Sequence, residues 1–124
     1  MYVFDSSIWF DYFQAKPWCK AIRPTMASND PILLSAVNLV EILSLYRLRA
    51  PPQADEIKDV LLNRCRLVEV TKEVALLASE LKARHALALA DAVVLATARL
   101  NDAVVWTYDS DFEGLKGARV LKRR

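Results

Sequence analysis

Short apolar runs alternate with longer amphipathic segments along the whole chain. The short runs are rich in β-branched and aromatic side chains, which is typical of buried strands, whereas apolar residues three or four positions apart predict helices. The predicted strands are residues 2–4, 32–34, 66–70, 103–106 and 118–121. The predicted helices are residues 8–13, 17–28, 35–49, 54–63, 72–84 and 86–98. This alternation predicts a parallel, three-layer α/β sheet in one domain, residues 1–124.

Three acidic residues interrupt otherwise apolar segments. Asp5 follows the first predicted strand, Glu41 lies within helix 35–49, and Asp91 is the one charged residue between positions 86 and 98. Each has an ordinary explanation: Asp5 could cap the next helix, Glu41 could face solvent on a polar stripe, and Asp91 could favour the positive end of a helix dipole. A charge in so apolar a helix is costly unless it is paired or bound to a metal, which favours a functional role for Asp91.

A second strand also ends in acids, because Asp109 and Asp111 come just after strand 103–106. Open α/β sheets bind ligands beyond the carboxyl ends of their strands, where Asp5 is also expected. The chain has one histidine, His85, and two cysteines without metal-ligand spacing. The remaining all-oxygen ligand set favours Mg²⁺ or Mn²⁺, which activate water and neutralise charge on a phosphoryl group.

Composition narrows the range of functions. The net charge is +2, but with the five acids above set aside, 17 basic residues face ten acidic ones, a balance of +7 that suits a phosphate-bearing substrate. Two glycines are too few for a glycine-rich phosphate loop. No apolar stretch is long enough for a membrane span, and no signal peptide is evident. Two distant cysteines, expected to be reduced, favour a cytoplasmic protein with no membrane partner.

Four motifs occur in order along the chain: Asp5-Ser6-Ser7, residues 35–42 containing Glu41, residues 89–98 containing Asp91, and residues 107–112 containing Asp109. Together they resemble the PIN-domain ribonucleases, and among these the VapC-type toxins of prokaryotic toxin–antitoxin modules. The resemblance covers essentially the whole chain. It implies a PIN-like α/β/α fold whose five-stranded parallel sheet has the order 3-2-1-4-5.

The resemblance also implies a function and a set of partners. The activity would be Mg²⁺- or Mn²⁺-dependent endoribonuclease cleavage of a structured RNA (tRNA or rRNA class) by a metal-activated water, leaving a 5′-phosphate and a 3′-hydroxyl. The protein would form a homodimer and be neutralised by a small antitoxin. Helix 8–13 is aromatic on every side, including Trp9 and Phe13, which predicts a surface for the antitoxin or for the dimer.

Roles for individual residues follow from the resemblance and from charge. The residues predicted to be catalytic and to hold the metal are Asp5, Glu41, Asp91 and Asp109, with Asp111 as an outer helper. Two hydroxyls, those of Ser7 and Thr107, are predicted to orient these carboxylates. The basic residues predicted to contact the RNA backbone are Lys16, Lys20, Arg23, Arg47 and Arg49. The basic tail, residues 122–124, is expected to be a solvated end.

Two other functions fit parts of the pattern. A phosphate-receiving signalling domain has a similar length and sheet, but it needs an aspartate after the third strand, where this chain has Thr71 and Lys72. A catalytically inactive PIN-like module that binds protein or RNA is the stronger alternative. The full set of acids argues against it, because buried carboxylates are costly to keep without a use.

Overall fold

Five short strands form one parallel sheet. The computed structural model describes all residues, 1–124. The strands are β1 (Tyr2–Phe4), β2 (Ile32–Ser35), β3 (Arg66–Val68), β4 (Val104–Thr107) and β5 (Ala118–Val120). Their order is β3-β2-β1-β4-β5 and every neighbouring pair is parallel, which confirms the order expected from the sequence motifs.

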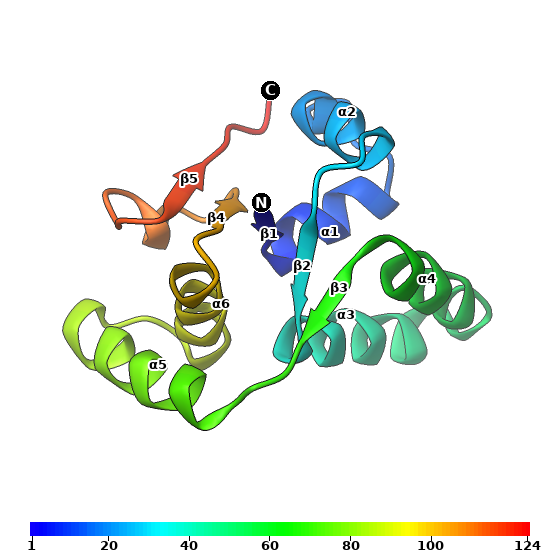
Figure 1. Cartoon of the computed structure of the whole chain (residues 1–124). Helices are drawn as coiled ribbons and strands as arrows, with labels where there is room; N and C mark the ends of the chain where they lie inside the picture. The colour runs from blue at the N-terminus through cyan, green and yellow to red at the C-terminus, as the bar shows by residue number, and fades with distance from the viewer.

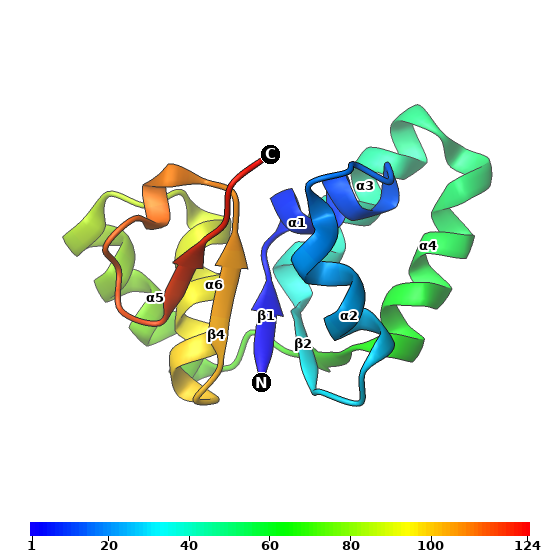
Figure 2. The same ribbon diagram turned by 90° about the horizontal axis from the view of Figure 1, so that it is seen from above.

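Helices cover both faces of the sheet (Figures 1 and 2). The α-helices are α1 (Ser6–Phe13), α2 (Ile22–Ala27), α3 (Ala36–Arg49), α4 (Pro51–Arg64), α5 (Lys72–His85) and α6 (Leu89–Leu100). Two short 3₁₀ helices, η1 (Cys19–Ala21) and η2 (Ser110–Phe112), complete the fold. None of the helices combines the length and the apolar character that crossing a membrane requires.

The alternation of side chains along the strands divides the interior into two apolar clusters. Val3, Leu33 and Val105 face α5 and α6, whose alanine- and valine-rich surfaces pack closely on them. The next residue of each strand, Phe4, Leu34 and Trp106, faces the opposite way. On that side the cluster is completed by residues from α1, η1, α2, α3 and α4. β1, β2 and β4 are therefore largely buried on both faces, which explains their mostly apolar sequences, whereas the edge strands β3 and β5 are more exposed.

The strand order reverses between β1 and β4, at the middle of the sheet. The chain leaves β1 toward β2 on one side of the sheet's centre and leaves β4 toward β5 on the other. A crevice therefore opens beyond the carboxyl ends of β1 and β4. β1 and β4 are in register, with Phe4 opposite Trp106. Asp5 follows Phe4 and Thr107 follows Trp106, so these two residues are brought together at the base of the crevice.

Several helix boundaries differ from the expected ones. Segment 86–98 becomes helical only at Leu89, because Ala86 takes a left-handed conformation (φ 53°) that ends α5. Segment 17–28 divides into η1 and α2. Pro51 and Pro52 begin α4, where a residue without a backbone N–H is tolerated.

One face of the aromatic helix α1 is part of the monomer core, which limits the surface that this helix was expected to offer to an antitoxin or to the dimer. Trp9 is 0% exposed and its ring lies 5.3 Å from that of Phe4. The reason is that η1 and α2 fold back beside α1, so only Phe10, Tyr12 and Phe13 stay partly exposed. The partner surface predicted for this helix therefore excludes Trp9.

The C-terminal tail is anchored through Arg123, and the expectation of a merely solvated end is wrong for this residue. Arg123 Nε donates a hydrogen bond to the buried carboxylate of Asp11 (2.8 Å), which also accepts one from Trp18 Nε1 (2.7 Å). The guanidinium of Arg123 lies over the ring of Tyr108, 5.0 Å from its centre. The tail thus ties α1 to the segment that follows β4.

Candidate active site

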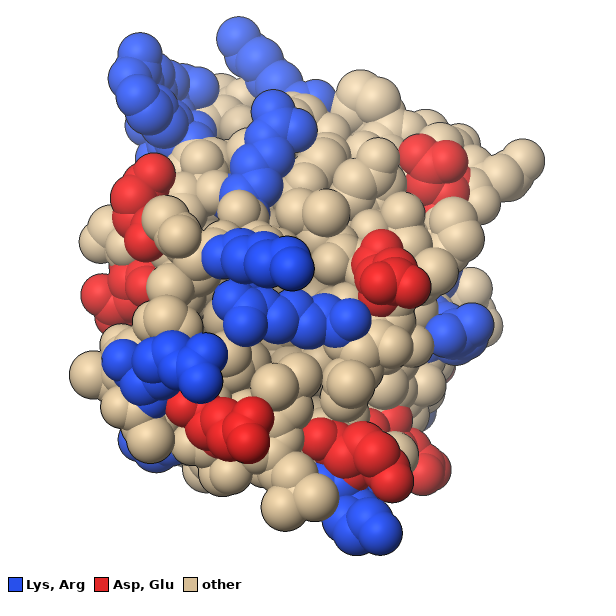
Figure 3. Space-filling view, turned by 60° about the vertical axis from the view of Figure 1, so that its left-hand side comes forward, with Lys and Arg blue, Asp and Glu red and all other residues tan.

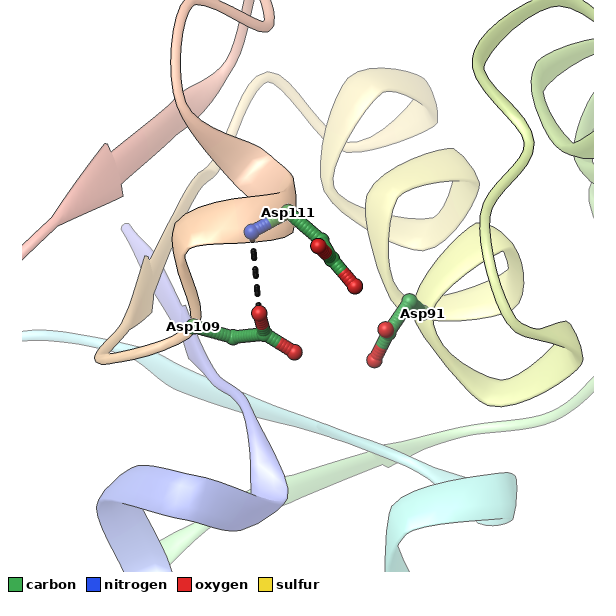
Figure 4. A group of neighbouring side chains, drawn as sticks. All are labelled: Asp91, Asp109 and Asp111. Carbon is green, nitrogen blue, oxygen red and sulfur yellow. Dashed lines mark hydrogen bonds between the residues drawn. The ribbon is translucent and has the colours of Figure 1, made fainter.

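Three carboxylates meet beyond the carboxyl end of β4 (Figure 4). Asp91 lies in the first turn of α6, Asp109 caps η2 and Asp111 lies within η2. One oxygen of each lies within 4.8 Å of the others. The backbone N–H of Asp111 donates to Asp109 Oδ1 (2.9 Å), so a tight turn after β4 presents both side chains to Asp91. Asp111 is therefore a full member of this cluster by its position.

Asp5 lies beside the cluster as a buried carboxylate with a network of its own. It caps α1 by accepting from the backbone N–H of Ser7 (3.3 Å), so the ordinary explanation for this residue is also correct. Ser7 Oγ (3.1 Å) and Thr107 Oγ1 both donate to Asp5 Oδ2. Ser7 and Thr107 thus hold Asp5 in place, and their role in orienting a metal ligand stays a prediction.

The same hydroxyls connect the two central strands. Ser7 Oγ accepts from the backbone N–H of Tyr108 (3.1 Å), and Thr107 Oγ1 accepts from that of Asp109 (2.9 Å). Asp5 and Asp109 are therefore linked through shared partners although they lie far apart in the sequence.

Glu41 lies on α3 and is exposed, as expected for a residue on a polar stripe, but its carboxylate accepts hydrogen bonds from neighbouring side chains. Glu41 Oε1 accepts hydrogen bonds from Ser6 Oγ (2.7 Å) and from Asn38 Nδ2 (3.2 Å). Asn38 Nδ2 also donates to Ser6 Oγ (2.8 Å). The sequence indicates the pairing of Asn38 with Glu41 through their three-residue spacing. Nothing in the sequence indicates the part played by Ser6.

Burial and mutual repulsion define the electrostatics of the site. The pKa of Asp91 is raised to about 7, mainly by burial and also by the charges of Asp5, Asp109, Glu41 and Asp111. Burial likewise raises the pKa of Asp5, against the hydrogen bonds from Thr107 and Ser7. The charge of Glu41 reaches Asp91, so all five acids form one electrostatic unit. These oxygen donors fit a hard divalent cation, which would relieve the repulsion.

The basic residues predicted to contact RNA lie on the side of the molecule formed by the first four helices. Lys16, Lys20 and Arg23 belong to the segment from the end of α1 to α2, and Arg47 and Arg49 lie in the last turn of α3. Arg23 Nη2 donates to the carbonyl of Lys16 (3.1 Å), and Arg47 pairs with Asp55 across to α4 (3.8 Å). Their contact with RNA stays a prediction. Lys and Arg side chains also form a band on the opposite side, where α5 and β5 come forward (Figure 3).

The sequence and the fold match a known class of proteins. The PIN domain family model matches residues 2–118, and the chain therefore belongs to the PIN domain family. A search of curated proteins finds no match.

Solved structures with the same fold come from toxin–antitoxin systems. A chain of a toxin–antitoxin complex from Klebsiella pneumoniae superposes with a TM-score of 0.83 at 21% identity, covering 97% of each chain. DNA-bound VapBC from Salmonella typhimurium gives 0.82 at 18% identity, covering 99% of this chain and 98% of that one. VapC20 from Mycobacterium tuberculosis, a toxin that cleaves the sarcin-ricin loop, gives 0.77 at 22% identity, covering 98% and 99%. The fold is that of VapC-type PIN domains.

Proposed function

We propose that this protein is a metal-dependent endoribonuclease that acts as the toxin of a toxin–antitoxin pair. The observation that carries the proposal is the gathering of Asp91, Asp109 and Asp111 beside Asp5 and Glu41 at the carboxyl edge of the sheet. An inactive binding module has no need for a cluster whose acids repel one another. Membership of the PIN domain family supports the same conclusion.

In this proposal some acids hold the metal ion and Asp5 also supports the base of the site. The cluster of Asp91, Asp109 and Asp111 would hold Mg²⁺ or Mn²⁺ with Asp5 and Glu41 at its border. When bound, the cation supplies a nucleophilic water at neutral pH and stabilises charge on the scissile phosphate. Asp5, held by Ser7 and Thr107, keeps the ends of β1 and β4 together as the base of the site. Breaking the P–O3′ bond leaves a 3′-hydroxyl and a 5′-phosphate.

The proposed substrate is a structured RNA of the tRNA or rRNA class. The band of Lys and Arg on the face where α5 and β5 come forward (Figure 3) supports a phosphate-rich substrate, because such charges attract nucleic acid regardless of sequence. Among the structures with this fold, the toxin that cleaves the sarcin-ricin loop acts on ribosomal RNA. The five basic residues from Lys16 to Arg49 named above remain our candidates for backbone contacts.

The proposed antitoxin site is a furrow along α3, between α1 and α4. One cavity of about 430 Å³ is lined by Phe10, Glu41, Ser44, Leu45 and Leu48. A second of about 420 Å³ is lined by Phe13, Gln14, Leu45, Tyr46, Arg49, Ala50 and Gln53. Leu45 borders both, so the two cavities are neighbours along α3. An antitoxin segment in this furrow would reach Glu41 and so interfere with the site.

We propose that the homodimer forms through a separate apolar face, on α5 and α6. Leu76 is 61% exposed on α5 and Leu89 is 67% exposed at the start of α6. Leu89 also borders an apolar cavity of about 250 Å³ with Val70, Ala75, Ala78, Ser79, Lys82 and Val93. Exposed apolar patches of this kind are typical of protein interfaces.

Cleavage of labelled RNA by purified, metal-stripped protein tests the proposal. We expect fragments with 5′-phosphates from tRNA or an rRNA hairpin after adding Mn²⁺ or Mg²⁺, and none with EDTA. Asp91→Asn should lower the rate by roughly 100-fold or more, since even losing a supporting partner of a metal ligand costs 10–100-fold. Asp102→Asn is the matched control, because this exposed acid lies before β4 at the opposite edge of the sheet. Cleavage in EDTA, or full activity of Asp91→Asn, would contradict the proposal.

A further inference from the structure

Ser6 and Asn38 hold the same oxygen of Glu41. Ser6 Oγ donates to Glu41 Oε1 over 2.7 Å and Asn38 Nδ2 donates to it over 3.2 Å. Asn38 Nδ2 also donates to Ser6 Oγ (2.8 Å), so the three side chains form a closed triangle. Both donors reach Oε1, while Oε2 accepts no hydrogen bond from the protein. One oxygen is therefore anchored and the other is left for a ligand.

The amide of Asn38 is only half satisfied. Asn38 is 1% exposed, and its Oδ1 has no hydrogen-bond partner. Its neighbours along α3 are apolar: Val37 packs against one apolar cluster and Ile42 belongs to the other. A buried oxygen without a partner destabilises the folded state, and an apolar side chain of similar size would avoid that loss. Packing alone therefore does not explain an asparagine at this position.

We propose that Asn38 and Ser6 are positioning residues for Glu41, and that Asn38 is retained for this task at the expense of stability. An exposed glutamate on a helix can adopt many side-chain conformations, and ordering it at the moment of metal binding would weaken the affinity. Two donors from different elements, α1 and α3, order the carboxylate beforehand. The inference rests on the proposed function, since it assigns Glu41 to the metal site.

The variant Asn38→Leu separates this role from a structural one. We expect its metal-free form to melt a few degrees higher than the wild type, because the unpaired oxygen is gone. We also expect its Mn²⁺ affinity, measured by calorimetric titration of the metal-free protein, to fall roughly 10- to 100-fold, as is usual when a partner of a metal ligand is lost. A side chain with only a structural role would not move these two quantities in opposite directions.

Asn101→Ala is the matched control. Asn101 Nδ2 donates only to the carbonyl of Thr97 (2.8 Å), at the end of α6 far from the acids. This variant should melt lower than the wild type and bind Mn²⁺ with unchanged affinity. Asn38→Leu is thus expected to raise stability and weaken metal binding, whereas Asn101→Ala is expected to lower stability and leave metal binding unchanged.

Ser6→Ala and Glu41→Gln complete the test. Ser6→Ala removes the shorter hydrogen bond with little change in volume, and it should weaken Mn²⁺ binding by itself. In the Glu41→Gln background neither Asn38→Leu nor Ser6→Ala should change the affinity further, because both act through Glu41. Unchanged affinity in the two single variants, or a loss that persists without Glu41, would overturn the positioning role. An Asn38→Leu protein less stable than the wild type would overturn the claim that Asn38 is retained at the expense of stability. A wild type that neither binds Mn²⁺ nor cleaves RNA would instead refute the proposed function, and this inference with it.

Discussion

Asp91 is the residue at which the electrostatic effects of the site converge. It is half-buried in the first turn of α6, and burial with four nearby acids raises its pKa from an ordinary 3.8 to about 7. The folded, metal-free protein therefore binds a proton at Asp91 between about pH 4 and pH 7 that the unfolded chain has already released. Under the linkage relation, this residue makes stability fall as the pH rises through that range, and the loss is complete above about pH 7.

Replacing Asp91 with asparagine should abolish this pH dependence. Asn resembles the protonated form of Asp, so at about pH 4 the metal-free Asp91→Asn variant should melt close to the wild type. At pH 8 the variant should melt higher, because the wild type then has a charge there that burial and its neighbours disfavour. Thermal melts in EDTA across this range measure the effect, with Asp102→Asn as the control. An Asp91→Asn variant less stable than the wild type at pH 8 would mean that the charge itself stabilises α6.

The helix α1 divides its aromatic side chains between two environments. Trp9 packs in the core against Phe4, whereas Phe13 lies at the edge of the furrow beside Tyr46, with ring centres 6.3 Å apart. One face of α1 thus packs in the monomer core, and the other is the face that we propose a partner contacts.

Substitutions on the two faces of α1 should have different consequences. Trp9→Ala should lower the free energy of unfolding by about 3–5 kcal/mol, as for other large aromatic residues in cores. Phe13→Asp should lower it much less, since the side chain is already partly exposed, but it should weaken co-purification with a co-expressed antitoxin. Urea denaturation and pull-down measure the two effects. If Phe13→Asp unfolds the protein as readily as Trp9→Ala, the helix belongs wholly to the core.

Metal binding should be linked to the stability of the whole molecule. The cluster draws on α6 and the turn after β4, and Asp5 after β1 and Glu41 on α3 border it, so a bound ion would connect elements from the whole length of the chain. Because the unfolded chain does not assemble this cluster, each bound ion favours the folded state.

Mn²⁺ should therefore raise the melting temperature of the wild type in a concentration-dependent way. At a hundred times the dissociation constant the gain is about 2.7 kcal/mol. Asp5→Asn and Asp91→Asn should gain much less because each has lost a carboxylate, while Asp102→Asn should behave as the wild type. Calorimetry with and without millimolar Mn²⁺ provides the measurement. A wild-type midpoint that stays constant would argue that these acids serve only as caps and hydrogen-bond partners.

The strand order was expected only from the family that the sequence motifs resemble. The sequence by itself determined most of the elements and the positions of the acids just after the strands. These features depend on local patterns: the apolar run 2–4 ends in Asp5, and strand 104–107 leads directly to Asp109. Parallel strands place such residues at one edge of the sheet whatever the details of packing. The hydrogen bond from Ser7 to Asp5 is likewise local, whereas Thr107 reaches Asp5 across 102 positions.

Only the tertiary structure decided which partners these residues meet and which surfaces stay exposed. Ser6 reaches Glu41 across 35 positions and Arg123 reaches Asp11 across 112, and no local period relates such pairs. The burial of Trp9 depends on where η1 and α2 fold back, which the composition of α1 does not reveal. Contacts of this kind depend on how helices pack across the sheet, and many sequences with the same local pattern are compatible with different packing.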